Sequence, residues 1–178
     1  MGRPQVPIEV DDVTGVWTTD GLPMIYVPRH FFVNNHVAIE SALGAETYAK
    51  QLYEAGFASA YSWCEHESRT HGLHGVEVFH HYMQRLSQRG WGRFTVQEVN
   101  AVSGQARVRV DYSVFVLQLG ATAGRKVCYM FTGWFPGALT WVSQSLGHAL
   151  RLRARESQCG ADGSCYCVFE VTPEVWSR

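Results

Sequence analysis

Three thiols and a carboxylate lie within twelve residues near the C-terminus of the chain. The stretch "ESQCGADGSCYC" (156–167) holds Glu156, Cys159, Cys165 and Cys167 around a turn rich in Gly and Asp. No C-x-x-C pair is present, so a thioredoxin-like redox couple is not favoured. Zn²⁺ accepts thiolate and carboxylate ligands in a tetrahedron, and turns between paired strands often carry them. The stretch therefore indicates either a zinc site or a group of small buried thiols without metal.

The segments on either side of this turn alternate in polarity, which is typical of paired strands. In "HALRLRARE" (148–156) Glu156 shares the apolar face, while the arginines face the solvent. In "CYCVFEV" (165–171) the period of two places Cys165 and Cys167 on the same face, so the pattern does not decide which is a ligand. The candidates for a ligand from a distant part of the chain are Cys64, Cys128 and the eight histidines.

Composition and charge narrow the class of protein. The N-terminal stretch "MGRPQVPIEVDDVTG" has no apolar run of signal-peptide length, and no run approaches the roughly 20 residues of a membrane span, so we expect a cytoplasmic protein without membrane contact. In a reducing compartment, an odd count of five cysteines favours free thiols or metal binding over disulfides. The net charge is −1, with 15 basic and 16 acidic side chains, so no nucleic-acid partner is expected.

The period of the apolar residues changes along the chain from helical to alternating. Helices are expected over 31–44, 45–72, 76–90 and 127–147, and hairpins over 92–116 and 148–171. Pro136 lacks an amide hydrogen and is expected to kink the last helix or start it anew. Helices followed by antiparallel hairpins are typical of an α+β fold. We predict an N-terminal extension (1–20) and one domain (21–178), whose helices pack on an antiparallel sheet built from two hairpins.

The C-terminal half resembles the vinyl-4-reductase (4VR) domain, which occurs in bacteriochlorophyll biosynthesis proteins and as the sensor of aromatic-responsive transcription activators. That domain is also related in fold to trafficking-complex subunits. The matching residues are Cys128, Gly133, Trp134, Gly137, Glu156, Cys159 and Cys167. The first half, including "VTGVWTTDGLPMIYVPRHFFVNNH", resembles a stand-alone bacterial subgroup of unknown function that accompanies genes for the breakdown of methylated glycines.

The resemblance implies a ligand set and a partner. It assigns Zn²⁺ to Cys128, Glu156, Cys159 and Cys167, and it implies a homodimer. Three thiolates and a carboxylate fill a tetrahedron, so such a zinc would be structural, whereas a catalytic zinc keeps a position open. We expect it to hold the last hairpin against the helix that carries the two glycines.

A small-molecule pocket is also implied by the resemblance. His81 approximately matches the histidine that contacts the polar group of the ligand in sensor members, while Val110 stands near the position of their pocket tryptophan. Trp134 and Trp141 lie seven residues apart, on nearly the same helical face, and are the candidates for the pocket wall. The segment "WCEHE" (63–67) is interpreted differently, as a solvated helix face with one buried cysteine, because residues two apart point to different sides of a helix.

We predict a cytoplasmic, zinc-braced protein that carries or senses a hydrophobic or heterocyclic metabolite. One alternative is an enzyme or enzyme accessory factor of a catabolic pathway, such as the breakdown of methylated glycines, that uses a pocket histidine. Another alternative is a protein-interaction scaffold. The sequence has no nucleophile elbow, phosphate loop, dinucleotide fingerprint or HExxH motif, which lowers the expectation of an enzyme.

Overall fold

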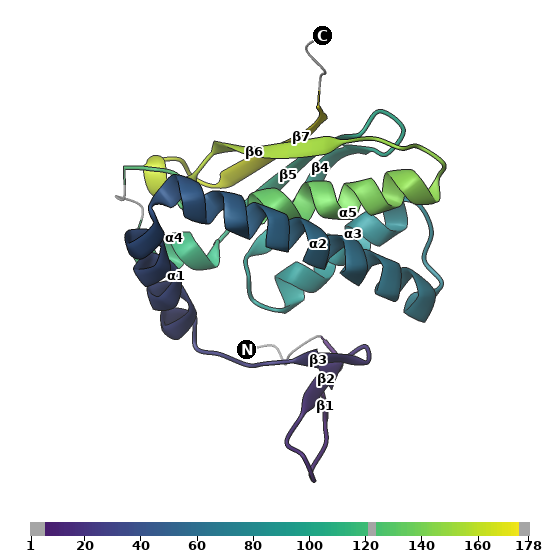
Figure 1. The fold of residues 1–178 in the computed structure, drawn as a ribbon, viewed down its shortest axis with the longest axis horizontal. Coiled ribbons are helices and arrows are strands. Elements are labelled where there is room, and N and C mark those ends of the chain that lie inside the picture. The colour runs from purple at the N-terminus through teal and green to yellow at the C-terminus, as the bar shows by residue number, and fades with distance from the viewer. Residues whose placement is uncertain (1–5, 121–123, 175–178) are drawn as a thin grey trace.

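The computed structural model describes residues 6–120 and 124–174 (Figure 1). The helices are α1 (Arg29–Leu43), α2 (Ala45–His71), α3 (Val76–Gln88), α4 (Val114–Leu119) and α5 (Phe131–Ser145), with a short 3₁₀ turn, η1 (Gly160–Asp162). The strands are β1 (Glu9–Val10), β2 (Trp17–Thr19), β3 (Leu22–Met24), β4 (Arg93–Asn100), β5 (Gln105–Asp111), β6 (Leu152–Gln158) and β7 (Cys167–Pro173). Within the described ranges, no helix combines the length and the apolar character needed to cross a membrane.

The main sheet has four antiparallel strands in the order β4-β5-β7-β6. It consists of the hairpins β4–β5 and β6–β7, joined where Val110 of β5 lies opposite Cys167 of β7. Helices α2, α3 and α5 lie on one side of this sheet (Figure 1). The predicted α+β class, with helices on an antiparallel sheet of two hairpins, is confirmed.

Helix α5 packs against α2 at a distance that only glycine permits. A Cβ atom at Gly133 would lie 2.3 Å from the main-chain oxygen of Tyr53, and one at Gly137 would lie 2.4 Å from that of Phe57. On its other side α5 contributes Phe135, which packs on Phe169 of β7 with a ring separation of 5.0 Å. The two glycines thus bring two helices and the sheet into one core.

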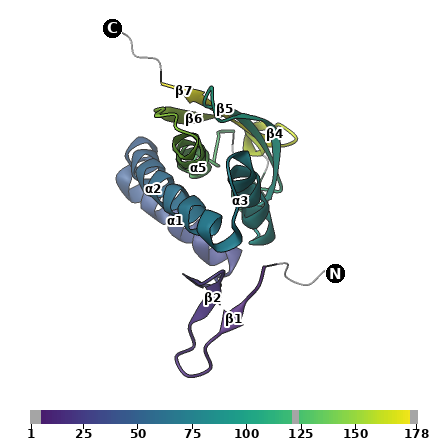
Figure 2. The same cartoon turned by 90° about the vertical axis from the view of Figure 1, so that its right-hand side faces the viewer.

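The N-terminal arm, residues 6–28, forms a separate small sheet in the order β1-β2-β3. It lies on the far side of the helices from the main sheet, and its β1–β2 hairpin projects away from the body (Figures 1 and 2). Apolar side chains of the arm remain exposed, with Val13 at 93% and Tyr26 at 86%. The predicted boundary after residue 20 falls between two strands of this sheet.

One local prediction was wrong, and a second was wrong in one of its two alternatives. The second strand of the first hairpin was expected to continue to Val116, but it ends at Asp111, and α4 begins at Val114. Asp111 pairs with Arg93, the first residue of β4, so the strand has no partner beyond it, and Tyr112 turns the chain with a φ of 55°. Helix α5 runs through Pro136, so no new helix starts at this residue, and the kink expected as the alternative stays a prediction.

Candidate functional site

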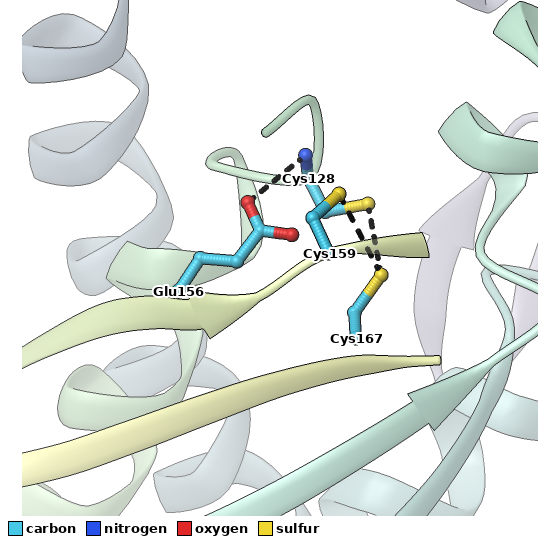
Figure 3. Close-up of side chains that lie close together, drawn as sticks. All are labelled: Cys128, Glu156, Cys159 and Cys167. Carbon is cyan, nitrogen blue, oxygen red and sulfur yellow. Dashed lines mark hydrogen bonds between the residues drawn. The ribbon is translucent and has the colours of Figure 1, made fainter. Parts of the chain in front are cut away.

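Cys128, Glu156, Cys159 and Cys167, which we call the thiol cluster, meet at one end of the main sheet (Figure 3). The four side chains are buried, and one donor atom from each lies within 4.8 Å of all the others. The sulfur of Cys167 is 3.6 Å from that of Cys128 and 3.9 Å from that of Cys159. Residues that are 39 positions apart in the sequence therefore form one compact donor set.

A bulged hairpin and a turn position these donors. Glu156 lies on β6, and the register with β7 shifts at a bulge directly after it. Cys159 follows the end of β6 and begins η1, where its sulfur accepts a hydrogen bond from the main-chain N–H of Ala161 (3.5 Å). Cys167 is the first residue of β7, and Cys128 lies in the turn just before α5. The cluster therefore joins both strands of the last hairpin to the start of α5.

Main-chain and ammonium donors surround the cluster. The N–H of Cys128 donates to Glu156 Oε2 (3.2 Å), and the N–H of Gly160 donates to the sulfur of Cys167 (3.2 Å). Lys126 Nζ donates to the main-chain oxygen of Glu156 (2.7 Å). These donors favour negative charge on the sulfur and carboxylate groups.

Four acidic groups in one buried site cannot all ionise without a cation, and their pKa values express this conflict. Burial, followed by the hydrogen bond and the negative charge of Cys159, raises the pKa of Glu156 to about 9. Hydrogen bonds with Cys159 and Cys167, together with burial, raise the pKa of the Cys128 thiol far above its usual range. The hydrogen bonds from Cys128 and Cys167 lower the pKa of Cys159. In the absence of a cation, the sulfur of Cys159 thus accepts hydrogen bonds from its neighbours, and the other acidic groups of the cluster keep their protons.

The thiol cluster fits a tetrahedral metal ion in three respects. Zn–S distances of about 2.3 Å place the sulfurs of a tetrahedron about 3.8 Å apart, close to the two separations between sulfurs given above. Glu156 Oε1 is buried and has no hydrogen-bond partner within the described part of the chain, so a cation would satisfy it. Three sulfurs and one carboxylate complete the coordination, so the geometry is compatible with a closed metal site.

The structure distinguishes Cys165 from Cys167 as a candidate ligand, which the alternating sequence pattern could not do. Cys165 is exposed and lies before β7, whereas Cys167 is buried within the cluster. Cys64, another candidate for the distant ligand, is buried in the helical layer on α2. The neighbouring Arg155 faces outward, where its guanidinium pairs with Glu170 (2.8 Å). Of the candidate ligands, Cys167 and Cys128 are therefore the ones brought next to Cys159.

A second group of donors lies in the helical layer, and we call Glu67, His71 and His81 the histidine cluster. Glu67 Oε2 is 2.8 Å from His81 Nε2 and 3.3 Å from His71 Nε2. The expectation of a solvated face at 63–67 was wrong, because Glu67 is completely buried. The arm covers this helix face: His66 Nε2 donates to the main-chain oxygen of Asp20 in the arm (2.8 Å).

Charged side chains surround the histidine cluster. Asp20 Oδ1 is 3.5 Å from His71 Nε2, and the Asp20 carboxylate pairs with Arg85 Nη2 (3.0 Å). Arg85 Nε lies 4.0 Å from Glu67 Oε2, so Arg85 is closer to Asp20 than to this oxygen. The ring of Trp63 stacks on that of His81 with a centroid separation of 5.6 Å and orients it. The cluster thus combines two imidazoles, buried carboxylates and a guanidinium.

The three residues predicted to bind a small ligand have different neighbours. His81 contacts Glu67 and Trp63. Trp134 packs into the aromatic core, with its ring 5.0 Å from that of Trp91 and its edge against Gly56. Trp141 is half-buried on the same helix, α5, and packs against the hydrophobic core. Their role in ligand binding stays a prediction.

A cleft of about 320 Å³ lies between the arm and the end of α3, and we call it the arm cleft. Its walls are largely apolar and include Ile8, Trp17, Met24, Ile25 and Tyr26, together with Arg89. Arg89 Nε and Nη2 are buried without a hydrogen-bond partner in the described ranges, and the guanidinium carbon lies 5.3 Å from the centre of the Trp63 ring. Burial lowers the pKa of Arg89, and the carboxylates of Glu67 and Asp20 oppose that shift. The cleft therefore combines an apolar wall with the cationic side chain of Arg89, two nitrogen atoms of which are buried and unpaired within the described ranges.

A wider and more open groove of about 750 Å³ runs between α2, α5 and β6. Tyr53, Phe57 and Tyr61 of α2 line it at a spacing of one helical turn. Tyr53 donates to the main-chain oxygen of Leu152 in β6 (3.3 Å), which closes part of the groove.

Comparisons with solved structures define the class of fold as 4VR-like. The phenol-responsive sensory domain of the transcription activator PoxR, solved with phenol, matches with a TM-score of 0.77 at 18% identity, over 96% of this chain and 87% of that chain. A trafficking protein particle complex subunit 3 from Naegleria fowleri, covalently bound to palmitic acid, matches with a TM-score of 0.55 at 10% identity (84% and 95%). A vinyl-4-reductase family protein from Methanocaldococcus jannaschii matches with a TM-score of 0.53 at 14% identity (85% and 85%).

Within that class, the chain belongs to the family described as "Domain of unknown function (DUF5943)", which matches residues 2–97. No curated protein matches the chain.

Sequence reasoning named His81 as a ligand-binding candidate but missed the other two members of the histidine cluster, Glu67 and His71. A signal was present, because Glu67 and His71 are four residues apart and therefore share one helix face. Comparing residues two apart within "WCEHE" concealed this pair. The third donor, His81, lies on another helix, so only the packing of α3 against α2 brings it to the other two.

Proposed function

We propose that the chain is a zinc-braced binding protein for a small organic molecule with an apolar body and an anionic group. Zn²⁺ would be held by Cys128, Glu156, Cys159 and Cys167, and its role is structural because the protein donors saturate it. The ligand would lie in the arm cleft and meet the guanidinium of Arg89. With a structural zinc and such a ligand, the protein would act as a cytoplasmic carrier or sensor of a hydrophobic or heterocyclic metabolite.

The zinc part of the proposal is supported by the chemistry of the donors. A buried set of three thiols and a carboxyl is unfavourable without a cation, as the raised pKa of Glu156 to about 9 indicates. Zn²⁺ removes this conflict by replacing the protons. In doing so it ties β6 and β7 to the start of α5, the helix that packs against α2 through Gly133 and Gly137. The metal therefore stabilises the layer against which the arm and its cleft are built.

The single observation that carries the ligand part is the state of Arg89. Two nitrogen atoms of this side chain are buried without a hydrogen-bond partner in the described residues, and an unmet buried donor costs about 1–3 kcal/mol or more when charged. The cleft that Arg89 lines has a volume of about 320 Å³, within the range of small-molecule sites. A ligand with a carboxylate or similar anion would be attracted to this cation and would bind its buried donors once the side chain turns toward the cleft, while Trp17 and Tyr26 would cover its apolar part. The likeness to the phenol-bound PoxR sensory domain supports a small-molecule role for the fold.

Native mass spectrometry of the freshly purified chain tests this proposal, because it detects metal and retained small molecules together. We expect zinc and an organic anion on the wild-type protein. We expect the anion, but not the zinc, to be lost from Arg89→Met. The matched control is Arg69→Met, which removes an exposed arginine of α2 and should change neither. A wild-type protein whose melting temperature is unchanged by any small aromatic or heterocyclic carboxylate, and which retains no small molecule, would refute the ligand part.

We also infer a homodimer, as the family resemblance implies. Large apolar side chains of the arm and of α1 are exposed, among them Tyr26, Phe31 and Leu43. Contiguous apolar surface on a soluble domain is typical of an interaction surface. Size-exclusion chromatography with light scattering gives the mass directly, and the expected value is twice the 20.0 kDa of one chain.

A further inference from the structure

We infer that the histidine cluster is a second metal site, which binds a divalent transition-metal ion of the zinc type through Glu67, His71 and His81. The inference goes beyond the zinc brace and beyond the ligand in the arm cleft, and it uses none of the thiol donors.

The backbone places the three donors in a common metal-binding arrangement. Glu67 and His71 are four residues apart on α2 and project from one face, and His81 approaches from α3. One donor atom of each lies within 4.8 Å of the others. A metal ion about 2.0–2.2 Å from nitrogen and oxygen donors separates neighbouring donors by about 3–3.5 Å. The distance of 3.3 Å between Glu67 Oε2 and His71 Nε2 falls in this range, and the hydrogen-bond distance of 2.8 Å to His81 Nε2 would lengthen by a few tenths of an ångström.

The Glu67 carboxylate has bonding capacity that no protein donor uses and that a metal ion could take up. It is completely buried, and its Oε1 has no hydrogen-bond partner among the residues described by the structure. Its Oε2 faces the ring nitrogens of both histidines, so a proton lies where a metal would bridge all three groups. Replacing protons between neutral imidazoles and a carboxylate is how such sites load with metal.

The surrounding groups support this arrangement. Trp63 stacks on His81 and orients its ring. Arg85 pairs with Asp20, so it balances that carboxylate and leaves Glu67 to the histidines, with its Nε 4.0 Å from Glu67 Oε2. The negative charges of Glu67 and Asp20 also act on Arg89, where they oppose the lowering of its pKa by burial.

Three protein donors leave a coordination position open, in contrast to the four of the thiol cluster. Two imidazoles and one carboxylate are a common donor set of zinc sites that bind water or a further ligand. The side chain of His71 is 31% exposed, so solvent and small anions reach the ion from this side. The site would therefore take a water molecule or an anionic or heterocyclic ligand directly on the metal.

Titration of Co²⁺ into the zinc-loaded full chain, followed by visible absorption, tests the inference. We expect one further equivalent to bind with the spectrum of nitrogen and oxygen ligands and without thiolate charge transfer. Glu67→Gln and His71→Gln should each weaken this binding by more than about tenfold, since the loss of an outer partner alone has such an effect. His71→Gln is the key variant, because its partly exposed side chain can be changed without disturbing the core.

The matched controls are Glu65→Gln on α2 and His80→Gln on α3, which remove neighbouring side chains of the same types outside the cluster. Both should bind Co²⁺ as the wild type does. Three results would each overturn the inference: no further equivalent bound by the wild type, unchanged affinity in His71→Gln, or thiolate charge transfer showing that cobalt entered the thiol cluster instead. In that case Glu67 and His81 form a hydrogen bond without metal, and the zinc brace and the arm cleft are decided by their own tests.

Discussion

The thiol cluster and the histidine cluster differ in how they are closed. The thiol cluster takes four donors from the last hairpin and the start of α5, all of them buried. The histidine cluster takes three donors from two neighbouring helices, and one of them, His71, remains partly exposed. The first has the donor number of a structural site and the second has that of a site with an open position.

The two clusters also differ in how they balance charge. In the thiol cluster, the conflict between buried acidic groups is seen in the pKa of Glu156, which is raised to about 9. In the histidine cluster, Arg85 and Asp20 already form an ion pair beside Glu67. The proposed zinc would therefore contribute to folding at the thiol cluster, whereas a metal ion at the histidine cluster would add to a fold that is already balanced.

The largest effect should follow from removing one thiolate. Cys159→Ser should yield protein that lacks zinc and is insoluble or unfolded. Structural zinc contributes an apparent free energy of about 10–16 kcal/mol in small peptides, while a whole domain has about 5–15 kcal/mol of stability. Zinc content and circular dichroism measure the outcome. The matched control is Cys165→Ser, since Cys165 is exposed and should leave both zinc and fold unchanged. A soluble and fully stable Cys159→Ser without metal would show that the thiol cluster is no brace.

The next effect is a pH dependence of the stabilisation by zinc. Without zinc, the pKa of Glu156 is raised from 4.5 to about 9 in the folded protein. A raised carboxyl pKa favours folding below the unfolded value, and this contribution is lost as the pH rises toward the folded value. Zinc removes that loss, so the difference in melting temperature between zinc-loaded and chelator-treated protein should widen as the pH rises from 4.5 toward 9. Glu156→Gln should reduce the widening, and a difference that narrows with rising pH would contradict this assignment.

A smaller effect is expected where α5 meets α2. Gly137→Ala should lower the free energy of unfolding by about 3 kcal/mol, because the new Cβ would lie 2.4 Å from the main-chain oxygen of Phe57 and the helices must separate. Urea denaturation measures it, and Ser145→Ala on the exposed end of the same helix is the control. If Gly137→Ala matched that control, the close contact of the helices would not limit stability.

The smallest effect should come from the histidine cluster. Glu67→Gln should lower the free energy of unfolding by about 1–2 kcal/mol, since Arg85 keeps Asp20 as its partner and Gln can still accept from His81. The zinc content of the thiol cluster should not change. Loss of that zinc in Glu67→Gln would mean that the two clusters are coupled through the fold and do not act separately.

Much of the fold could be predicted from the sequence because its local patterns are strong. Helix α2 was expected over 45–72 and spans Ala45–His71, and both hairpins of the sheet were expected. The short helix α4 was missed, because "SVFV" has strand-like residues. These residues have no strand to pair with, since β4 begins at Arg93, which lies opposite Asp111. The local sequence pattern therefore predicted most helices and strands, but it did not predict the residue at which the pairing of two strands ends.

For the candidate sites too, local sequence pattern identified some residues, while others depend on tertiary packing. The four residues of the thiol cluster could be named because three of them lie within twelve positions and the fourth, Cys128, was implied by family resemblance. Their convergence is now a feature of the structure, and the metal stays a proposal. The burial of Glu67 and its contact with His81 could not be predicted, because the approach of α3 to α2 is a result of tertiary packing.

The most direct test of the zinc brace is a crystal structure with anomalous diffraction measured on both sides of the zinc absorption edge. We predict an anomalous peak about 2.3 Å from the sulfurs of Cys128, Cys159 and Cys167, with a carboxylate oxygen of Glu156 as the fourth ligand. Sulfur atoms that lie apart with no peak between them, or a metal ion with a water molecule in its inner shell, would contradict a closed structural site.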